Sequence, residues 1–259
     1  GIISDGSTAL ALTKAGSGTL TLSGTNTYTG VTTINAGTLS VATIGNGGVA
    51  GNLGQATNTA SNLVLGGGTL KYTGSTASTD RAFTISTGTT GTFDVSTSGT
   101  DLTISGASAS TSGALTKVGS GRLILSGANA YTGATTISAG ALRASNTTAL
   151  GTTASGTTVA NGAALEITTS IGAEALTLNG DGISSAGSLR NISGNNSYAG
   201  AITLSTNAVR INSDSGTLTL SGGIDNGAIA ITFGGSGNTT MSTVAIGSGT
   251  TKTGTLTKD

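Results

Sequence analysis

The chain repeats itself. Residues 12–39 recur as residues 115–142 without a gap, and 20 of the 28 aligned positions are identical. Units copied this closely usually stack, because each copy then buries the apolar face of its neighbour. The repeat therefore predicts an array of stacked units whose function belongs to an extended outer surface.

Two weaker copies accompany the two clear ones. The third runs from 189 to 211 and keeps Ser193, Gly194, Asn196 and Tyr198 in place, and a fourth begins at Gly254. We expect one repeat array over 1–259, a fragment of a longer protein that continues in both directions. The copies are expected near 12–43, 115–146 and 189–214, with the fourth starting at 254.

The composition predicts a folded chain with a narrow core. Leu, Ile, Val and Phe together make up about a fifth of the chain, whereas 45 residues are Gly. So few core-forming residues would indicate disorder if the net charge were large. The formal net charge is zero and only 8% of the residues are charged, so we expect the chain to fold.

Four residue types are absent from the sequence: Cys, His, Pro and Trp. A chain without Cys has no disulfide and no thiolate nucleophile or metal ligand. A chain without His lacks the commonest metal ligand and general base at neutral pH. The absence of Pro suits strands that are paired on both edges. No apolar run approaches the roughly 20 residues that a membrane-spanning helix needs.

Apolar and polar residues alternate with period two, which predicts strands. The clearest runs are Thr19–Leu22, Val31–Ile34 and Thr38–Val41, and turn-forming residues lie between them. No window of helical length has a 3.6-residue period, so we expect no helices. Further strands are predicted at 63–65, 69–72, 82–85, 92–95 and 102–104.

The free edges of the strands favour one all-β architecture. An open sheet of so many strands would leave edges that promote aggregation, whereas a solenoid pairs each strand with the coils on both sides. Three strands of about five residues with their corners make a coil of roughly 20 to 25 residues. We therefore predict a single parallel β-helix of about eleven coils.

The repeated motif resembles a known family. Its pattern is LTKxGxGxLxLSGxNxYTGxTTIxxGxL, which begins at Leu12 in the first copy and at Leu115 in the second. This pattern is similar to the passenger-associated transport repeat of bacterial autotransporter proteins. Leu70 to Gly74, followed by Asp80 to Thr84, resembles a common companion segment of that repeat.

The resemblance implies both a fold and a role. The fold is a right-handed parallel β-helix, exported through the outer membrane of a Gram-negative bacterium by the protein's own C-terminal β-barrel. The role is that of a rigid stalk and contact surface at the cell surface, active in adhesion or aggregation. The partners implied are host cells, neighbouring cells or matrix polymers, and the chain could also associate with itself end to end or laterally. Nucleic acid is not expected, because the five Lys and five Arg are spread singly.

Two other functions are weighed against this one. The first is a subunit of an extracellular filament or biofilm fibre whose solenoid ends stack between chains. The second is a carbohydrate-active β-helix enzyme, for which Asp80, Arg81, Asp94 and Asp101 form the only dense charged cluster. The structural interpretation of that cluster is that Asp80 caps a turn and that Arg81 faces solvent or pairs with a carboxylate. We expect no enzyme and no catalytic residues.

Three other patterns have structural interpretations that we favour. The segment from Gly234 to Asn238 weakly resembles a calcium-binding nonapeptide but has Asn where the Asp ligand should be, so we expect a turn and neither metal nor cofactor. Tyr28, Tyr131 and Tyr198 share one repeat position and are expected to pack at a corner. Threonine pairs such as Thr19 and Thr21 could form a hydroxyl array, but such pairs show no period across the predicted coils.

Overall fold

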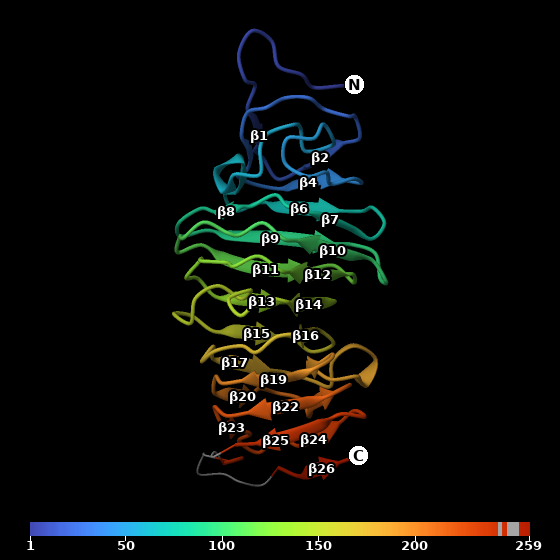
Figure 1. Cartoon of the computed structure of the whole chain (residues 1–259), viewed down its shortest axis with the longest axis vertical. Helices are drawn as coiled ribbons and strands as arrows, with labels where there is room; N and C mark the ends of the chain where they lie inside the picture. Colours follow the sequence, from blue (N-terminus) through green and yellow to red (C-terminus); the bar gives the residue numbers. More distant parts are fainter. Residues whose placement is uncertain (243–244, 248–253) are drawn as a thin grey trace. The chain divides into compact units, whose positions relative to one another are not determined.

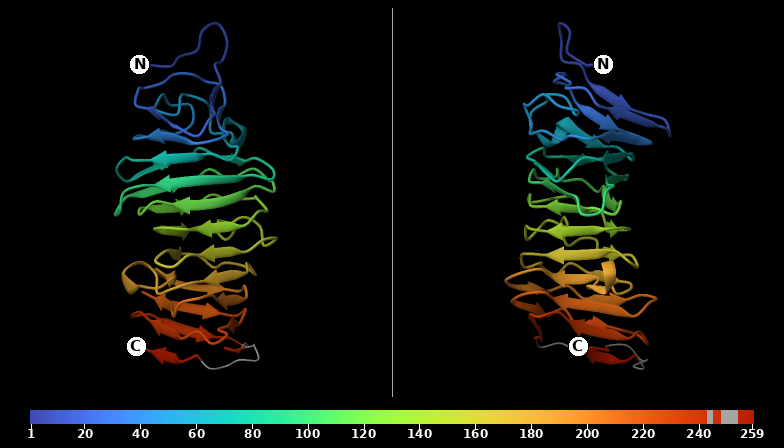
Figure 2. Two further views of the ribbon diagram at one scale, coloured as in Figure 1. Left: turned by 180° about the vertical axis from the view of Figure 1, so that it is seen from behind. Right: turned by 90° about the vertical axis from the view of Figure 1, so that its right-hand side faces the viewer.

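The computed structural model describes residues 1–242, 245–247 and 254–259, and the chain divides into two compact units, Gly1–Gly133 and Ala134–Asp259. In each unit the strands of successive coils lie one above another (Figure 1). Two further views show the same stacking within each unit (Figure 2).

Unit 1 contains three parallel sheets. Their strand orders are β1-β3-β5-β8, β2-β4-β6-β9-β11 and β7-β10-β12. The strands are β1 (Leu12–Lys14), β2 (Thr19–Leu22), β3 (Thr32–Ile34), β4 (Thr38–Val41), β5 (Leu63–Leu65), β6 (Thr69–Tyr72), β7 (Ala77–Thr79), β8 (Thr84–Ile85), β9 (Thr90–Val95), β10 (Asp101–Ile104), β11 (Ala114–Val118) and β12 (Arg122–Leu125).

Unit 2 is built in the same way. Its sheets have the orders β13-β15-β17-β20-β23, β14-β16-β18-β21-β24-β26 and β19-β22-β25. The strands are β13 (Thr135–Ile137), β14 (Ala141–Ala144), β15 (Thr157–Val159), β16 (Ala164–Ile167), β17 (Leu176–Leu178), β18 (Leu189–Asn191), β19 (Asn195–Tyr198), β20 (Ile202–Leu204), β21 (Val209–Ser213), β22 (Thr217–Leu220), β23 (Ile224–Asp225), β24 (Ile231–Gly234), β25 (Asn238–Met241) and β26 (Leu256–Lys258).

Apolar side chains stack in columns inside each unit. In unit 1 Leu102 pairs with Leu123, and each is at most 1% exposed. In unit 2 Leu165, Leu189 and Ile211 are register partners on three successive strands, and all are fully buried. Because side chains along a strand point alternately to its two faces, the residues that alternate with these apolar ones on each strand point outward.

The fold predicted from sequence is confirmed. The chain is an all-β parallel solenoid of about eleven coils. The described residues contain no α-helix, only two 3-10 turns, η1 (Ala60–Asn62) and η2 (Ile183–Ser185). Neither turn has the length or apolar character of a membrane-crossing helix, and no other helix occurs in the described residues. The strand predicted at 82–85 is shorter than expected, and β7 was not predicted.

The coils differ in length. Leu39 pairs with Leu20, which lies 19 residues earlier, and with Leu70, which lies 31 residues later. The long coil contains the loop 42–62, which leaves the sheets between β4 and β5. Sequence spacing alone therefore does not reveal which residues become neighbours.

The third repeat copy keeps its strands despite its changed sequence. Arg190, which stands where the motif has Leu, points outward between Glu166 and Asp214. Leu189 takes the inward place, because it pairs with Leu165 on the preceding coil. The inward leucine is thus displaced by one residue relative to the motif. This displacement preserves the apolar column, which Arg190 at the motif's Leu position would otherwise interrupt.

The glycine of the Tyr-x-Gly motif is required by close backbone contact. A Cβ atom at Gly200 would overlap the carbonyl group of Glu174 on the preceding coil. Gly30 and Gly133 occupy the same repeat position, and each would overlap a backbone carbonyl group in the same way. The motif therefore marks the places where two coils touch through their backbones.

We expect Gly200→Ala to destabilise unit 2 by about 3 kcal/mol, because the coils must separate to admit the methyl group. Gly172→Ala is the matched control, since no atom of the described residues lies within 4 Å of a Cβ at Gly172, and it should change stability by at most about 0.5 kcal/mol. Chemical denaturation followed by circular dichroism measures both effects. Equal stability of the two variants would contradict the close contact.

Candidate functional site

A column of threonines runs along the outer face of unit 1. Strand pairing places five threonines side by side on successive strands of one sheet: Thr19, Thr38, Thr69, Thr92 and Thr116. The first is exposed and the others are half-buried. We call this set the unit 1 threonine column.

Unit 2 carries a similar column on the sheet that contains β13. Thr136, Thr158, Thr177 and Thr203 are register partners on four successive strands. Thr158 and Thr203 are exposed, and the other two are half-buried. We call this set the unit 2 threonine column.

The threonine pairs themselves do not recur across coils, as expected, because Thr21 pairs with Ser40 and Ser40 pairs with Lys71. Thr19 alone belongs to a regular column, whose other members come from differently spaced coils. Successive hydroxyl and methyl groups recur at the strand spacing, about 4.8 Å. Each hydroxyl can donate and accept a hydrogen bond, so a column suits contact with a regular polar surface or a polymer.

The sheet that contains β14 carries charges instead. Glu166, whose side chain is 2% exposed, contacts Arg143 at 2.7 Å on one side and Arg190 at 3.2 Å on the other. Arg190 also contacts Asp214. The positive and negative charges alternate along the coils, so this face forms an internally paired ladder.

Two motif lysines are structural. In unit 1, Lys14 donates hydrogen bonds from Nζ to the carbonyl oxygens of Ala15, Gly16 and Ala36 at 2.7–3.0 Å. Lys117 is fully buried and donates to Val118 and Gly119. Desolvation lowers the pKa of Lys117 to about 8, although the charge of Asp94 opposes that shift. The motif lysine thus satisfies turn carbonyls that would otherwise be unpaired.

The structure places Arg81 differently from the sequence-based interpretation. The side chain was expected to face solvent or a carboxylate, but Arg81 is only 3% exposed. Its guanidinium donates to backbone carbonyls of the loop 42–62, including Gly54 at 2.8 Å and Gly45 at 2.9 Å. Asp80 accepts from the backbone N–H of Gly47 at 2.7 Å and so anchors the same loop.

The other members of the charged cluster lie in separate interactions. Asp94 is 3.8 Å from Lys71, whereas Asp101 pairs with Arg122 at 2.9 Å on a different sheet. Each carboxylate therefore has its own cationic or backbone partner. The four candidates for a carbohydrate-active site, Asp80, Arg81, Asp94 and Asp101, thus belong to three distinct structural interactions.

The repeat tyrosines pack inside the units. Tyr28, Tyr131 and Tyr198 are all fully buried, as the corner-packing interpretation predicts. The Tyr28 hydroxyl is 2.8 Å from the Thr32 hydroxyl. In the third copy Ile202 stands at the position of Thr32, and the Tyr198 hydroxyl has no hydrogen-bond partner among the residues that the structure describes. Burial strongly raises the pKa of Tyr198, and the nearby Glu174 charge adds to the shift.

The glycine-rich segment forms a turn, as predicted. Gly234 ends β24, Asn238 begins β25, and Gly237 donates its backbone N–H to Ser213 at 2.7 Å. Among the described residues, no group of three or more acidic side chains is arranged to hold a metal ion.

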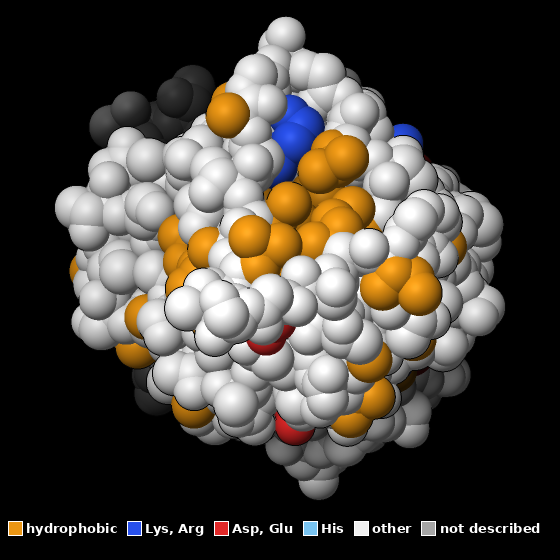
Figure 3. Space-filling model, turned by 90° about the horizontal axis from the view of Figure 1, so that it is seen from above, with side chains coloured by type: hydrophobic (Ala, Val, Ile, Leu, Met, Phe, Trp, Pro, Cys, Tyr) orange, Lys and Arg blue, Asp and Glu red, His pale blue; other side chains and the backbone are white. Residues whose placement is uncertain are grey.

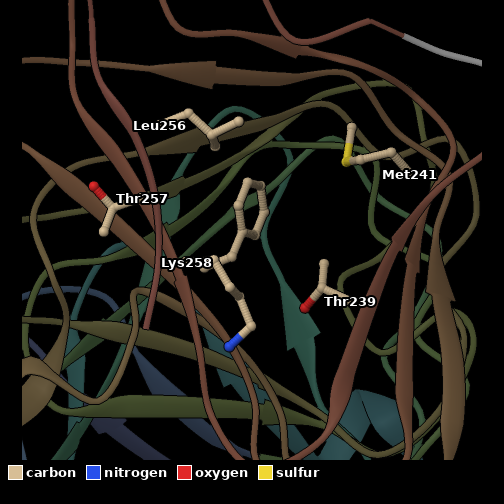
Figure 4. Close-up of a pocket in the computed structure, with 6 residues that line it drawn as sticks. Thr239, Met241, Leu256, Thr257 and Lys258 are labelled. Carbon is tan, nitrogen blue, oxygen red and sulfur yellow. The ribbon is translucent and has the colours of Figure 1, made fainter.

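Apolar surface gathers near both ends of the described chain. Seen onto the N-terminal end, apolar side chains gather near the centre of the surface (Figure 3), and Ile2 is 68% exposed. In unit 2 a cavity of about 160 Å³ is lined by Phe233, Met241 and Leu256 together with Thr239, Thr257 and Lys258. Leu256 and Met241 lie on opposite sides of this cavity (Figure 4). Its largely apolar wall offers no converging catalytic groups.

A second cavity of unit 2 surrounds a buried carboxyl group. Glu174 is 3% exposed and lines a cavity of about 430 Å³ together with the loop from Thr147 to Thr153. Its Oε1 accepts a hydrogen bond from the Thr157 hydroxyl at 3.1 Å. Burial raises the pKa of Glu174 to about 7, and the bond from Thr157 only partly opposes this. We call this cavity the Glu174 pocket.

The Glu174 pKa makes stability depend on pH. The folded-state pKa of about 7 exceeds the ordinary 4.5, so its contribution to stability is present below pH 4.5 and is lost as pH rises through 7. We expect unit 2 to lose up to about 3 kcal/mol between pH 4.5 and pH 8. Glu174→Gln should remove this loss, which thermal melts at several pH values would measure. The chain has no His that would titrate in the same range. An unchanged pH dependence in the variant would contradict the assignment.

Comparison with known proteins supports the motif-based resemblance. Residues 12–41 and 115–144 match the Passenger-associated-transport-repeat family. Over 86 residues the chain is 48% identical to a protein named Adhesin BmaC autotransporter from Brucella suis biovar 1 (strain 1330). The match covers 33% of this chain and only 2% of that relative. No solved structure matches the chain. The chain therefore carries autotransporter passenger-associated repeats and is homologous to an autotransporter adhesin.

Proposed function

We propose that this chain is a segment of an autotransporter passenger, displayed on a Gram-negative outer membrane, and that it acts as a rigid stalk and adhesive contact surface. The observation that carries the proposal is the pair of passenger-associated repeats, each of which forms coils of a parallel solenoid. The similarity to an adhesin supports the same role. No reaction is proposed.

The proposal also covers the partners of the chain and its place in the full-length protein. The chain would be one repeat array of a longer passenger, exported by the protein's own C-terminal β-barrel. The two threonine columns and the paired charge ladder give it polar outer faces, which suit contact with polymers on host cells, neighbouring cells or matrix. Formation of stacked coils outside the cell would help draw the chain outward.

Surface display has a direct test. Antibodies raised against this chain should label intact cells that express the full-length protein, and external protease should remove the label. Deleting the C-terminal β-barrel should abolish the labelling of intact cells. Labelling that requires permeabilised cells would overturn the proposed location.

The contact surface has a separate test. Beads coated with the chain should adhere to epithelial cells or to bacteria, and three Thr→Lys changes in the unit 2 threonine column, at Thr158, Thr177 and Thr203, should weaken adhesion. The matched control places Lys at Ser197, Thr219 and Thr240, register partners on another face. Circular dichroism verifies that both variants fold. Equal adhesion by the two folded variants would contradict a contact role for the column.

A further inference from the structure

Arg81 of unit 1 and Glu174 of unit 2 occupy equivalent places in the two units. In unit 1 the repeat strand β3 pairs with β5, and β5 pairs with β8, so that Ile85 is stacked two coils after Ile34. In unit 2 Leu178 is stacked two coils after Ile137 in the same way. Arg81 lies four residues before Ile85, and Glu174 lies four residues before Leu178.

In unit 1 this place is filled by a guanidinium group. Arg81 donates hydrogen bonds to five backbone carbonyls of the loop 42–62. The acceptors are Gly45, Asn46, Val49, Gly54 and Ala56, at 2.8–3.5 Å. The cation therefore forms the polar centre of the loop that follows the repeat.

The loop that follows the repeat in unit 2 preserves the same turn. Gly54 donates its backbone N–H to the carbonyl of Gly51 at 3.0 Å, and Gly151 donates to Thr148 at 3.0 Å. A leucine precedes the turn glycine in both loops. The positions equivalent to Gly54 and Ala56, two acceptors of the Arg81 guanidinium, are therefore Gly151 and Thr153.

Gly151 and Thr153 both line the Glu174 pocket. Their carbonyl oxygens accept no hydrogen bond from any residue that the structure describes. The hydrogen bond from Thr157 goes to one carboxyl oxygen of Glu174, and the described part of the chain donates none to the other. The place that holds a cation in unit 1 is thus a cavity in unit 2, lined by a carboxyl group and free acceptors.

We propose that the Glu174 pocket binds a guanidinium group that a ligand supplies, with the Glu174 carboxylate and the carbonyls of Gly151 and Thr153 as its acceptors. A planar guanidinium offers five donors and pairs well with a carboxylate. The cavity of about 430 Å³ has the size of a small-ligand site. This binding adds a specific contact to the chain and does not depend on the adhesive role proposed above.

The guanidinium can come from an arginine side chain of a partner protein or from a small free guanidine. Calorimetric titration of the purified chain at pH 8 with agmatine and with the peptide Gly-Arg-Gly separates these sources. Both probes should bind, while the peptide Gly-citrulline-Gly, which is neutral but similar in shape, should not. Tighter binding of Gly-Arg-Gly indicates a protein partner, and tighter binding of agmatine indicates a small ligand.

Two variants test the role of Glu174. Glu174→Gln should weaken binding at least tenfold without changing the shape of the pocket. Glu174→Arg should abolish binding because its own guanidinium fills the cavity as Arg81 does in unit 1. Asp181→Asn, which removes an exposed carboxylate from the same unit, should leave binding unchanged.

The pH profile supplies an independent readout. Tyr198 also interacts with Glu174, and its raised pKa keeps it protonated throughout this range. Because the Glu174 pKa is about 7, affinity should rise about tenfold between pH 6 and pH 8 and then level off. No binding up to about 10 mM probe, equal binding of the citrulline peptide, or unchanged binding by Glu174→Gln would overturn the proposal.

Discussion

Leu123→Asp is expected to unfold unit 1 or to destabilise it by about 3–5 kcal/mol, because it places an unpaired charge inside the stacked apolar column. Leu123 is 0% exposed and pairs with Leu102 on the preceding coil. Thermal melts followed by circular dichroism would measure the loss, and surface yield of the displayed protein should fall with it.

Leu20→Asp should cost less than Leu123→Asp. Leu20 is half-buried, and its strand β2 has one pairing partner, β4, among the described strands. Thr21→Ser, on the outer side of the same strand, should change stability by at most about 0.5 kcal/mol. Unchanged melting of Leu123→Asp, or a larger effect of Leu20→Asp, would contradict the inward stacking described here.

Arg81→Met should destabilise unit 1 by about 3–5 kcal/mol. The substitution keeps an unbranched side chain but leaves the carbonyls of the loop 42–62 without their donors. Because burial already lowers the pKa of Arg81, its charge is tolerated only through these hydrogen bonds. Guanidinium chloride unfolding would measure the change in the free energy of unfolding.

Lys71→Met is the matched control for this prediction. It also removes a cation from unit 1, but the Lys71 side chain is 38% exposed and lies 3.8 Å from Asp94. A loss of at most about 1 kcal/mol is expected for such an exposed pair. If Arg81→Met costs no more than Lys71→Met, the guanidinium does not hold the loop together.

The strands and their stacking could be predicted from sequence because their signal is local. The alternation in Thr19–Leu22 and Thr38–Val41 predicted both strands with their observed bounds. The near-identical copies, together with the absence of Pro, favoured a chain paired on both edges. Neither signal depends on which residues from distant coils become neighbours.

The threonine columns and the Glu174 pocket could not be predicted because they depend on register between coils of unequal length. Thr38 and Thr69 are neighbours across 31 residues, whereas Thr19 and Thr38 are neighbours across 19. The equivalence of the Arg81 and Glu174 positions in the two units can be recognised only once this register is known. A signal for Glu174 was present, since a lone acid preceding the apolar pair of β17 is unusual in a chain with so few charges.

In-register stacking of successive coils can be tested most directly with paired cysteines, since the natural chain has none. Thr158 and Thr177 are register partners on adjacent strands, which lie about 4.8 Å apart. Thr158 and Thr203 lie two strands apart, roughly 9.6 Å, beyond the reach of a disulfide. Under mild oxidation, the Thr158→Cys, Thr177→Cys pair should cross-link and the Thr158→Cys, Thr203→Cys pair should not. Cross-linking of the second pair but not the first would contradict the solenoid.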